Sequence, residues 1–429
     1  MHKDHLGIRE ITRVEGHGNI VINLSKGKIE ELRLDIIESP RFFEAMLRGR
    51  RYDEAQHIMS RICGICAVSH TSASLKAIES AMGIEISAQA RLLRELAFAG
   101  ETLQSHMLHL YFLTLPDFFK MGSVVPIMKS MPDILRPGLD IKKLANEIGR
   151  VVGGRYVHPI SLFPGGVAYT PEKKELKELK DSLGKSFCLL DKTVETFSQF
   201  PAPLFCKDRE FISLKDKGGY GFYDGTPFSS QKDSIKEKTY TTRIKEYCVP
   251  HSTAKHARTR GHAFMVGALA RVNNNFADLK PLAKKIAKRF GLTAPCTNPF
   301  MNNAAQIVEC FHTAQGAIDT IDKLLLMGPK PEKAGKPAGF GTGIGLVEAP
   351  RGTLYHEYTI NKEGIVVRAN CIIPTAQNLR SMEEDLKSYV PTLLGKTKKE
   401  ITQGVESLVR AYDPCISCAT HIMNVRFTS

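Results

Sequence analysis

The chain has 429 residues, 42% of them hydrophobic, and a formal net charge of +14 at pH 7. This composition is ordinary for a globular protein and argues against extensive disorder. Lysines and arginines are spread along the chain without a nucleic-acid-binding motif, so we expect a solvated basic surface and no nucleic-acid partner.

The first predicted elements are a hairpin, a short helical segment and two helices. Residues 19–37 contain two apolar strands around a turn, and a helical segment follows at once. Apolar spacing after Cys66 predicts that a helix begins there. Residues 88–115 predict a long, largely buried helix, on which His106 and His109 are expected to be hydrogen-bonded core residues.

The second half of the chain alternates between helices and less regular segments. Residues 207–262 are rich in Lys, Gly and Tyr with little periodicity, and we expect an irregular surface excursion there. Strands at 354–360 and 365–373 are expected to form a hairpin. The remaining helices are predicted at 171–200, 276–290, 303–327 and through 401–408.

Two cysteine pairs lie near opposite ends of the chain. Each pair has a spacing of three residues and is followed by a histidine: Cys63, Cys66 and His70, then Cys415, Cys418 and His421. Residues i and i+3 face the same side of a helix or tight turn, so each pair can direct two sulfurs at one ion. Asp413 and Pro414 predict an N-cap and a first helical residue, a position that favours thiolate.

Four interpretations of these pairs stay open from spacing alone. One shared site for nickel, iron, copper(I) or zinc is favoured by the soft sulfur ligands and the following histidines. A structural zinc ribbon normally places its pairs roughly 15–20 residues apart. A redox CxxC explains one pair only, and buried cysteines can occur by coincidence.

A shared site requires both ends of the chain to meet in one core. We therefore predict that residues 1–429 form a single compact unit with an α+β, predominantly helical fold, a long-helix core and peripheral β-hairpins. No run approaches the roughly 18 apolar residues that span a bilayer, and no signal-type segment is present. The other cysteines have no regular spacing, which also favours a cytoplasmic, reducing location.

Seven short motifs follow one another in a fixed order, at 11–18, 61–70, 153–159, 266–271, 348–352, 373–375 and 413–421. In this order they resemble the large, catalytic subunit of nickel-iron hydrogenases along the length of the chain. Residues 104–118 resemble the cytoplasmic branch that includes the methyl-viologen-reducing, heterodisulfide reductase-associated type. The resemblance implies reversible heterolytic oxidation of dihydrogen to protons and electrons.

The resemblance also implies the metal ligands. Cys63 and Cys415 would be terminal ligands of nickel. Cys66 and Cys418 would bridge nickel to an iron that carries carbon monoxide and cyanide. Cys415 would accept the proton, and Glu15 would carry it onward.

Other motif residues would surround this centre. Without the motif, Glu15 would be expected to pair with Arg13 instead. Arg351, after Pro350, would place its guanidinium beside cyanide and act as an outer-sphere base. Thr375 would hydrogen-bond the second cyanide, and His70 would donate to a bridging sulfur. Asp413 is expected first as an N-cap and second as a partner of Arg351.

A second ion and several partners are implied as well. Glu44, His421 and the backbone carbonyl of Cys371 would bind magnesium or iron. No ferredoxin-type cysteine cluster remains, so we expect iron-sulfur clusters on a small subunit. Further electron-accepting subunits of heterodisulfide reductase or flavin type are expected, as are nickel chaperones and a maturation protease acting on the tail 422–429.

Two alternatives come from other classes of protein. A structural or quinone-coupling subunit of the respiratory complex I type shares the fold, but such relatives have lost the thiolates. A zinc-stabilised binding protein would explain the cysteines and leave Glu15, Arg351 and the order of the motifs unexplained.

Overall fold

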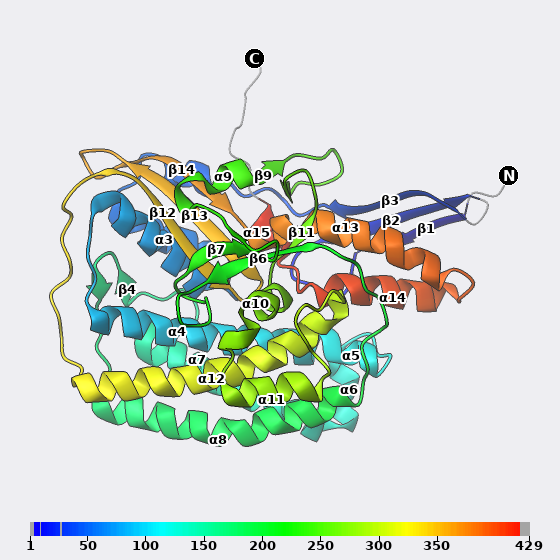
Figure 1. Cartoon of the computed structure of the whole chain (residues 1–429), viewed down its shortest axis with the longest axis horizontal. Helices are drawn as coiled ribbons and strands as arrows, with labels where there is room; N and C mark the ends of the chain where they lie inside the picture. The colour runs from blue at the N-terminus through cyan, green and yellow to red at the C-terminus, as the bar shows by residue number, and fades with distance from the viewer. Residues whose placement is uncertain (1–3, 9, 26–27, 421–429) are drawn as a thin grey trace, which may run out of the picture.

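The computed structural model describes residues 4–8, 10–25 and 28–420, and arranges them in two layers (Figure 1). One layer consists of long helices that lie side by side. These helices are α4 Ala88–Leu108, α7 Pro132–Gly153, α8 Lys173–Ser198 and α12 Asn302–Met327. Both α4 and α8 pack against α7 and against α12, so the four helices bury their apolar faces in a common core.

The predicted helix at 88–115 is regular only in its first part. The side chain of Ser87 caps α4 by accepting a hydrogen bond from the backbone N–H of Ala90 at 2.9 Å. After Leu108 the chain widens into a π-helical turn, His109–Thr114, before α5 Leu115–Phe118. Pro116 follows this turn closely and has no N–H to continue an α-helical ladder.

The second layer contains an antiparallel sheet of β12 Gly341–Ala349, β13 Gly352–Ile360 and β14 Val366–Ile372. Helix α3 Ala67–Met82 packs along β12. A Cβ at Gly345 would lie 1.9 Å from the carbonyl oxygen of Ala73, so this close contact requires glycine. The sequence predicts β13 and β14 but not β12, because its glycines weaken the strand pattern.

Residues 207–262 differ from the irregular surface excursion that the sequence predicts. They contain β6 Glu210–Lys215, β7 Thr226–Ser229, β8 Asp233–Ser234, β9 Ile244–Tyr247 and β10 His256–Thr259. Residues 210–214 of β6 are all buried. These strands are two to six residues long, too short to produce a visible period among the turns between them.

Two helices near the C-terminal end bring the second cysteine pair to the centre. These are α13 Pro374–Leu393 and α14 Lys398–Ala411, which pack on each other and lead to the short helix α15 Ile416–Ala419. In Figure 1, α15 lies beside α13 near the centre of the molecule. The sheet β1 Asp4–Ile8, β2 Gly18–Ser25 and β3 Lys28–Ile36 extends to one side, and its last two strands confirm the predicted hairpin.

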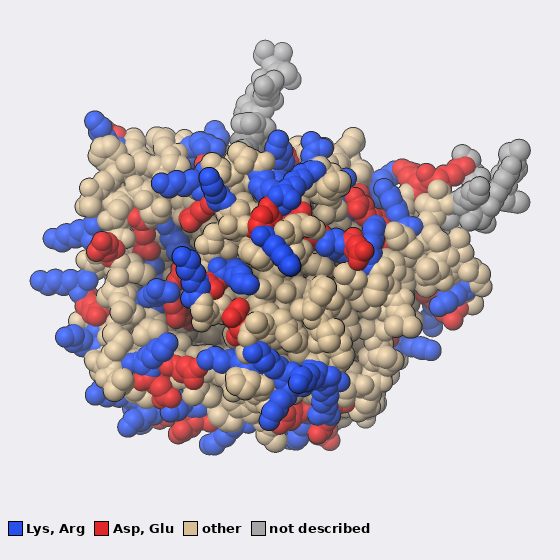
Figure 2. All heavy atoms as spheres, viewed as in Figure 1, with Lys and Arg blue, Asp and Glu red and all other residues tan. Residues whose placement is uncertain are grey.

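The other elements are short or lie at the periphery of these layers. Their bounds are α1 Phe43–Leu47, α2 Tyr52–Met59, α6 Val124–Ser130, α9 Tyr240–Arg243, α10 Ala268–Asn275, α11 Pro281–Arg289, β4 Leu162–Phe163, β5 Gly166–Val167 and β11 Phe264–Met265. Figure 2 shows Lys and Arg scattered among Asp and Glu over one face of the molecule. Among the described helices, none combines the length and apolarity that a membrane crossing requires.

Candidate metal centre

The four cysteines of the two pairs meet between the layers. Cys66 is the residue before α3, and Cys415 is the residue before α15. All four side chains are buried, and their sulfurs lie within 4.8 Å of one another. The separations are 3.5 Å from Cys63 to Cys415, 3.7 Å from Cys66 to Cys418, and 2.7 Å from Cys415 to Cys418.

This thiol cluster fits a metal ion better than it fits four free thiols. Hydrogen bonds from Cys415 and Cys418 hold the pKa of Cys63 well below its usual range, whereas burial raises the pKa of Cys415. Several thiolates this close together and away from water repel one another unless a cation compensates them. Four sulfur donors suit a soft or borderline transition metal.

Glu15 lies against the thiol cluster and not against Arg13. Its Oε2 accepts hydrogen bonds from Cys415 Sγ and from the backbone N–H of Ser417, each at 3.0 Å. The hydroxyl of Ser417 donates to its Oε1. Arg13 instead pairs with Asp117 at 2.5 Å, so the simple ion pair expected without the motif is wrong.

Gly16 explains why Glu15 can approach so closely. Its φ is +85°, and a Cβ there would lie 2.7 Å from Cβ of Ile416 and 2.8 Å from the backbone nitrogen of Ser417. The carbonyl of Glu15 accepts a 2.9 Å hydrogen bond from the N–H of Ile416. The N-terminal motif therefore fits the C-terminal motif through backbone contact.

Asp413 is not the N-cap that the sequence predicts. Its φ is +51°, and Cys415 precedes the first residue of α15. The Oδ1 of Asp413 accepts a hydrogen bond from Nε of Arg351 at 3.1 Å, and its Oδ2 accepts one from Gln306 at 3.0 Å. Because the buried guanidinium is the stronger partner, the carboxylate turns toward Arg351 and away from the helix terminus.

Arg351 occupies the turn between β12 and β13 and is 4% exposed. Burial disfavours its charge, but Asp413 and then the nearby cysteines outweigh burial and hold the pKa of Arg351 well above its usual range. Its Nη2 lies 3.0 Å from Oδ1 of Asp413 and still has no hydrogen-bond partner among the described residues. One buried donor is thus available to a ligand at the centre.

Thr375 and Pro350 lie close to the same residues. The hydroxyl of Thr375, in the first turn of α13, accepts a 2.9 Å hydrogen bond from the backbone N–H of Cys415. The carbonyl of Pro350, a buried residue, accepts a 2.9 Å hydrogen bond from Arg271. Both residues therefore fix the backbone that carries Cys415 and Arg351.

On the other side of the centre, His70 lies in the first turn of α3. Its Nδ1 is 3.2 Å from Nε2 of His356, and Nδ1 of His356 is 2.6 Å from the hydroxyl of Tyr358. The sequence analysis missed His356 and Tyr358, because no motif marks them and strand β13 supplies both.

Glu101, on α4, is a further residue that sequence reasoning missed. Its carboxylate accepts hydrogen bonds from the backbone N–H groups of Val68 and Ser69, at 2.5 Å and 2.9 Å, at the start of α3. Burial raises the pKa of Glu101 to about 8. This contact ties the N-terminus of α3, and with it Cys66, to the long-helix layer.

The two predicted core histidines, His106 on α4 and His109 in the π-helical turn after it, are confirmed as hydrogen-bonded residues. His106 Nε2 lies 2.8 Å from Oε2 of Glu309, and His109 Nδ1 lies 2.6 Å from Oε1 of Gln306. Both partners are on α12. These contacts link the long-helix layer to Asp413 through Gln306.

The predicted second ion site is only partly within the described residues. Glu44 is fully buried on α1, which packs against β14, the strand that contains Cys371. Burial and then the charge of Glu44 raise the pKa of the Cys371 thiol. His421 and the tail 422–429 lie outside the described residues.

Buried thiols with a carboxylate at one sulfur are typical of a cysteine-ligated metalloenzyme, and comparisons with known proteins identify which kind. A sequence model described as nickel-dependent hydrogenase matches residues 41–131 and 208–421, and one described as HoxL-like matches residues 5–39. The chain belongs to the nickel-dependent hydrogenase family and is an oxidoreductase that acts on dihydrogen. The resemblance predicted from the motifs is confirmed.

Individual relatives agree over nearly the full length. The alpha chain of sulfhydrogenase 1 from Pyrococcus furiosus is 34% identical over 97% of this chain and 98% of its own length. One subunit of the F420-non-reducing hydrogenase of Methanothermobacter marburgensis is 31% identical over 98% of this chain and 95% of its own length.

A solved structure of an NAD⁺-reducing [NiFe]-hydrogenase in the H2-reduced state has a TM-score of 0.88 and 28% identity, covering 97% of this chain and 99% of its own. A [NiFeSe]-hydrogenase from Dm. baculatum, at 22% identity, has a TM-score of 0.76. The predicted fold class, α+β and predominantly helical, is therefore confirmed.

Proposed function

We propose that the thiol cluster holds a nickel-iron pair and splits dihydrogen heterolytically. Cys63 and Cys415 would hold nickel, Cys66 and Cys418 would hold both nickel and iron, and the iron would carry carbon monoxide and cyanide. The support is the family membership together with four buried sulfurs within 4.8 Å of one another. When bound, such a pair supplies the Lewis acid that polarises dihydrogen.

The proposed proton route from Cys415 to Glu15 rests on the 3.0 Å contact between Cys415 Sγ and Glu15 Oε2. In this contact the sulfur donates, so a proton accepted by Cys415 already points at the carboxylate. Glu15 is partly exposed, whereas all four cysteines are buried. The carboxylate can therefore receive a proton from the centre and release it toward solvent.

Arg351 acts as a fixed charge in this proposal. A guanidinium paired with Asp413 and with a raised pKa holds its proton, so its contacts favour charge stabilisation over the outer-sphere base role. Its Nη2 would donate to one cyanide. The hydroxyl oxygen of Thr375 accepts a hydrogen bond from the N–H of Cys415, so this contact leaves the hydroxyl proton free to donate. That proton would be donated to the other cyanide.

The remaining site residues have supporting roles. His70 would donate to a bridging sulfur while its Nδ1 is fixed by His356. Glu44, the carbonyl of Cys371 and His421 would bind magnesium or iron near the C-terminal end of the described chain. The backbone N–H of Arg41, three residues before Glu44, donates to the carbonyl of Thr420 at 2.8 Å, which brings these segments together.

The electrons need a partner, since the only cysteine cluster among the described residues is the proposed nickel-iron site. We propose an iron-sulfur small subunit with clusters of its own, and further subunits of heterodisulfide reductase or flavin type. Each of the relatives is named as one subunit of a larger enzyme. We also propose a cytoplasmic location, one compact unit over residues 1–429, and maturation by nickel chaperones and a protease.

The variant Glu15→Gln tests the proton route, because glutamine keeps the shape of the side chain but cannot accept the proton. We expect unchanged nickel and iron contents and exchange of deuterium gas with water slowed by about 10²–10⁴-fold. Glu38→Gln is the matched control, since Glu38 is partly exposed like Glu15 and accepts a hydrogen bond from the N–H of His17, in the same motif, at 3.1 Å. Exchange at the wild-type rate in Glu15→Gln would remove Glu15 from the route.

A further inference from the structure

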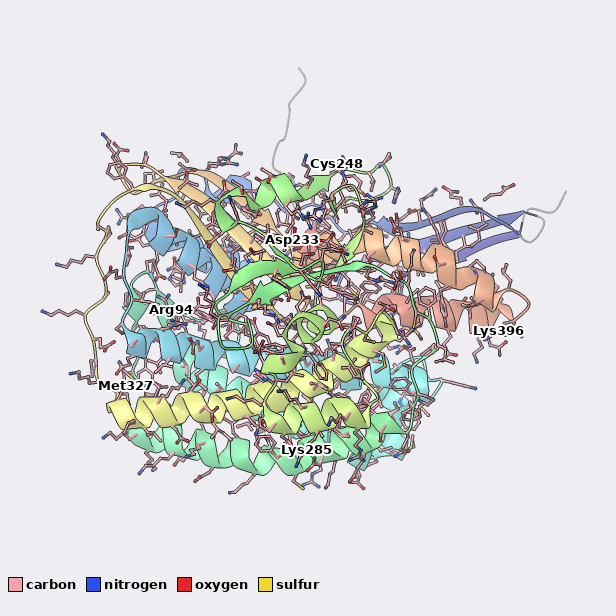
Figure 3. All side chains as sticks on the ribbon, viewed as in Figure 1. Arg94, Asp233, Cys248, Lys285, Met327 and Lys396 are labelled. Carbon is pink, nitrogen blue, oxygen red and sulfur yellow. The ribbon has the colours of Figure 1, made fainter. Side chains whose placement is uncertain are left out.

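A second group of candidate metal ligands lies away from the thiol cluster. His251 is in the loop between β9 and β10, His256 is the first residue of β10, and Glu383 is on α13. One ligand atom from each of the three lies within 4.8 Å of the others. Figure 3 labels Cys248, which begins the loop, near the top of the molecule in that view.

The ring of His256 lacks a partner that its burial requires. The residue is 1% exposed, and its Nε2 is buried without a hydrogen-bond partner among the described residues. Burial lowers the pKa of His256 to about 4, so the ring is neutral near pH 7 and keeps a lone pair. A buried ring nitrogen in this state costs free energy unless a ligand occupies it.

The other two side chains are already held together and in place. His251 Nε2 lies 2.8 Å from Oε1 of Glu383, and the rings of His251 and His256 are 5.8 Å apart at 88°. The backbone N–H of Leu34 on β3 donates to Oε1 of Glu383 at 3.0 Å. Such a contact orients a carboxylate in the way that outer hydrogen bonds orient metal ligands.

The loop that carries His251 is itself fixed to β3. The backbone N–H of Thr253 donates to the carbonyl of Ile36 at 3.0 Å, and its hydroxyl donates to the carbonyls of Ile36 and Glu38 at 3.0 Å and 2.8 Å. The three candidate ligands therefore converge from a loop, a strand and a helix that β3 holds together. Little rearrangement is needed to close them on an ion.

We propose that His251, His256 and Glu383 form a binding site for a divalent transition ion, best suited to Zn²⁺. Two imidazoles and one carboxylate are a donor set that zinc accepts in tetrahedral sites, with a fourth position left for water or another ligand. Neutral imidazoles disfavour Mg²⁺ and Ca²⁺, which prefer oxygen. In this site the ion replaces the hydrogen bond between His251 and Glu383.

His256 and Glu383 help to line a cavity of about 380 Å³, which leaves room for a further ligand. Cationic side chains line it as well, among them Arg258, Arg380 and Lys387. Arg380 is paired with Glu384 at 3.0 Å, and Arg258 lies over the ring of Tyr247. The local positive charge favours an anion, such as hydroxide or a carboxylate, as the fourth ligand.

Zinc at this site would fasten the β9–β10 hairpin to α13, the helix whose Thr375 supports Cys415. The test uses the assembled enzyme, equilibrated with Zn²⁺ and then freed of loosely bound metal. We expect one zinc per chain in the wild type, with only nitrogen and oxygen neighbours in its X-ray absorption spectrum. His256→Ala should lose that zinc and keep nickel and iron, and His262→Ala, an exposed histidine in the next turn, should keep all three metals.

A second variant covers the case in which His256→Ala does not assemble. Glu383→Gln keeps the acceptor for Leu34 and removes only the carboxylate charge, and we expect at least tenfold weaker zinc binding. Equal zinc in the wild type and in these variants would overturn the site, as would zinc with sulfur neighbours. Nickel is counted in the same samples, so failure of the proposed nickel-iron centre would be seen separately.

Discussion

The residues on the two sides of Cys415 differ in how readily they can exchange a proton. On one side Glu15 is partly exposed and accepts a hydrogen bond from the sulfur itself. On the other side Arg351 is buried and its guanidinium is paired with Asp413. A carboxylate at a boundary with solvent can exchange protons, whereas a buried, paired guanidinium keeps its charge. We therefore propose that the Glu15 side carries protons and that the Arg351 side supplies a fixed charge.

We expect the largest loss of activity from a change at Cys415, because both sides of the centre depend on its sulfur. Cys415→Ser removes the sulfur that faces Glu15 and that would bind nickel. Because loss of even an outer partner typically costs 10–100-fold, we expect loss of this ligand to reduce hydrogen oxidation by more than about 100-fold. Metal analysis of the purified enzyme checks the cause, since nickel should fall well below one per chain. A variant that kept both nickel and activity would contradict the assignment of Cys415.

The electrostatic role of Arg351 is tested by a variant that keeps the positive charge but replaces the guanidinium group. Arg351→Lys retains a cation but loses the fork that contacts Asp413 through Nε. We expect full metal content and hydrogen oxidation reduced by about 10–100-fold. Exchange of deuterium with water should fall less than in Glu15→Gln, because the proton route stays intact. If Arg351→Lys slowed exchange more than Glu15→Gln, the division between the two sides would be wrong.

The smallest effect is expected at the support of Cys415. Thr375→Val removes the acceptor of the Cys415 N–H and leaves a buried donor without its partner, at a cost of about 1–3 kcal/mol. We expect a lower melting temperature and a modest loss of activity. Thr375→Ser keeps the hydroxyl and serves as the control. Equal melting temperatures for Thr375→Val and Thr375→Ser would show that this hydrogen bond does not contribute to stability.

Long periodic elements of the fold were predictable from the sequence. Helix α8 and the strands β13 and β14 lie close to where the sequence puts them, because their apolar residues recur with a clear period. Strand β12 was hidden by glycines that allow α3 to approach. Helices α7 and α13 were not predicted; in α7 the internal Pro137 interrupts the helical pattern.

The site was predictable as a set of residues and less so as a set of contacts. Spacing and motif order indicated the four cysteines, and the structure brings their sulfurs together. The N-cap role of Asp413 was wrong, because Arg351 is a stronger partner than a helix terminus and no sequence pattern joins residues this far apart. Close backbone approach occurs at Gly16, whereas a Cβ at Gly64, within the first cysteine pair, would meet only Val157 at 3.9 Å.

An infrared spectrum of the purified enzyme, with nickel and iron counted on the same sample, tests the central claim most directly. We predict sharp metal carbonyl and cyanide bands at one nickel per chain, because carbon monoxide and cyanide are proposed on an iron beside nickel in the thiol cluster. The bands should disappear in Cys415→Ser. Zinc in place of nickel at the thiols, with no such bands in enzyme matured in its own host, would contradict the account.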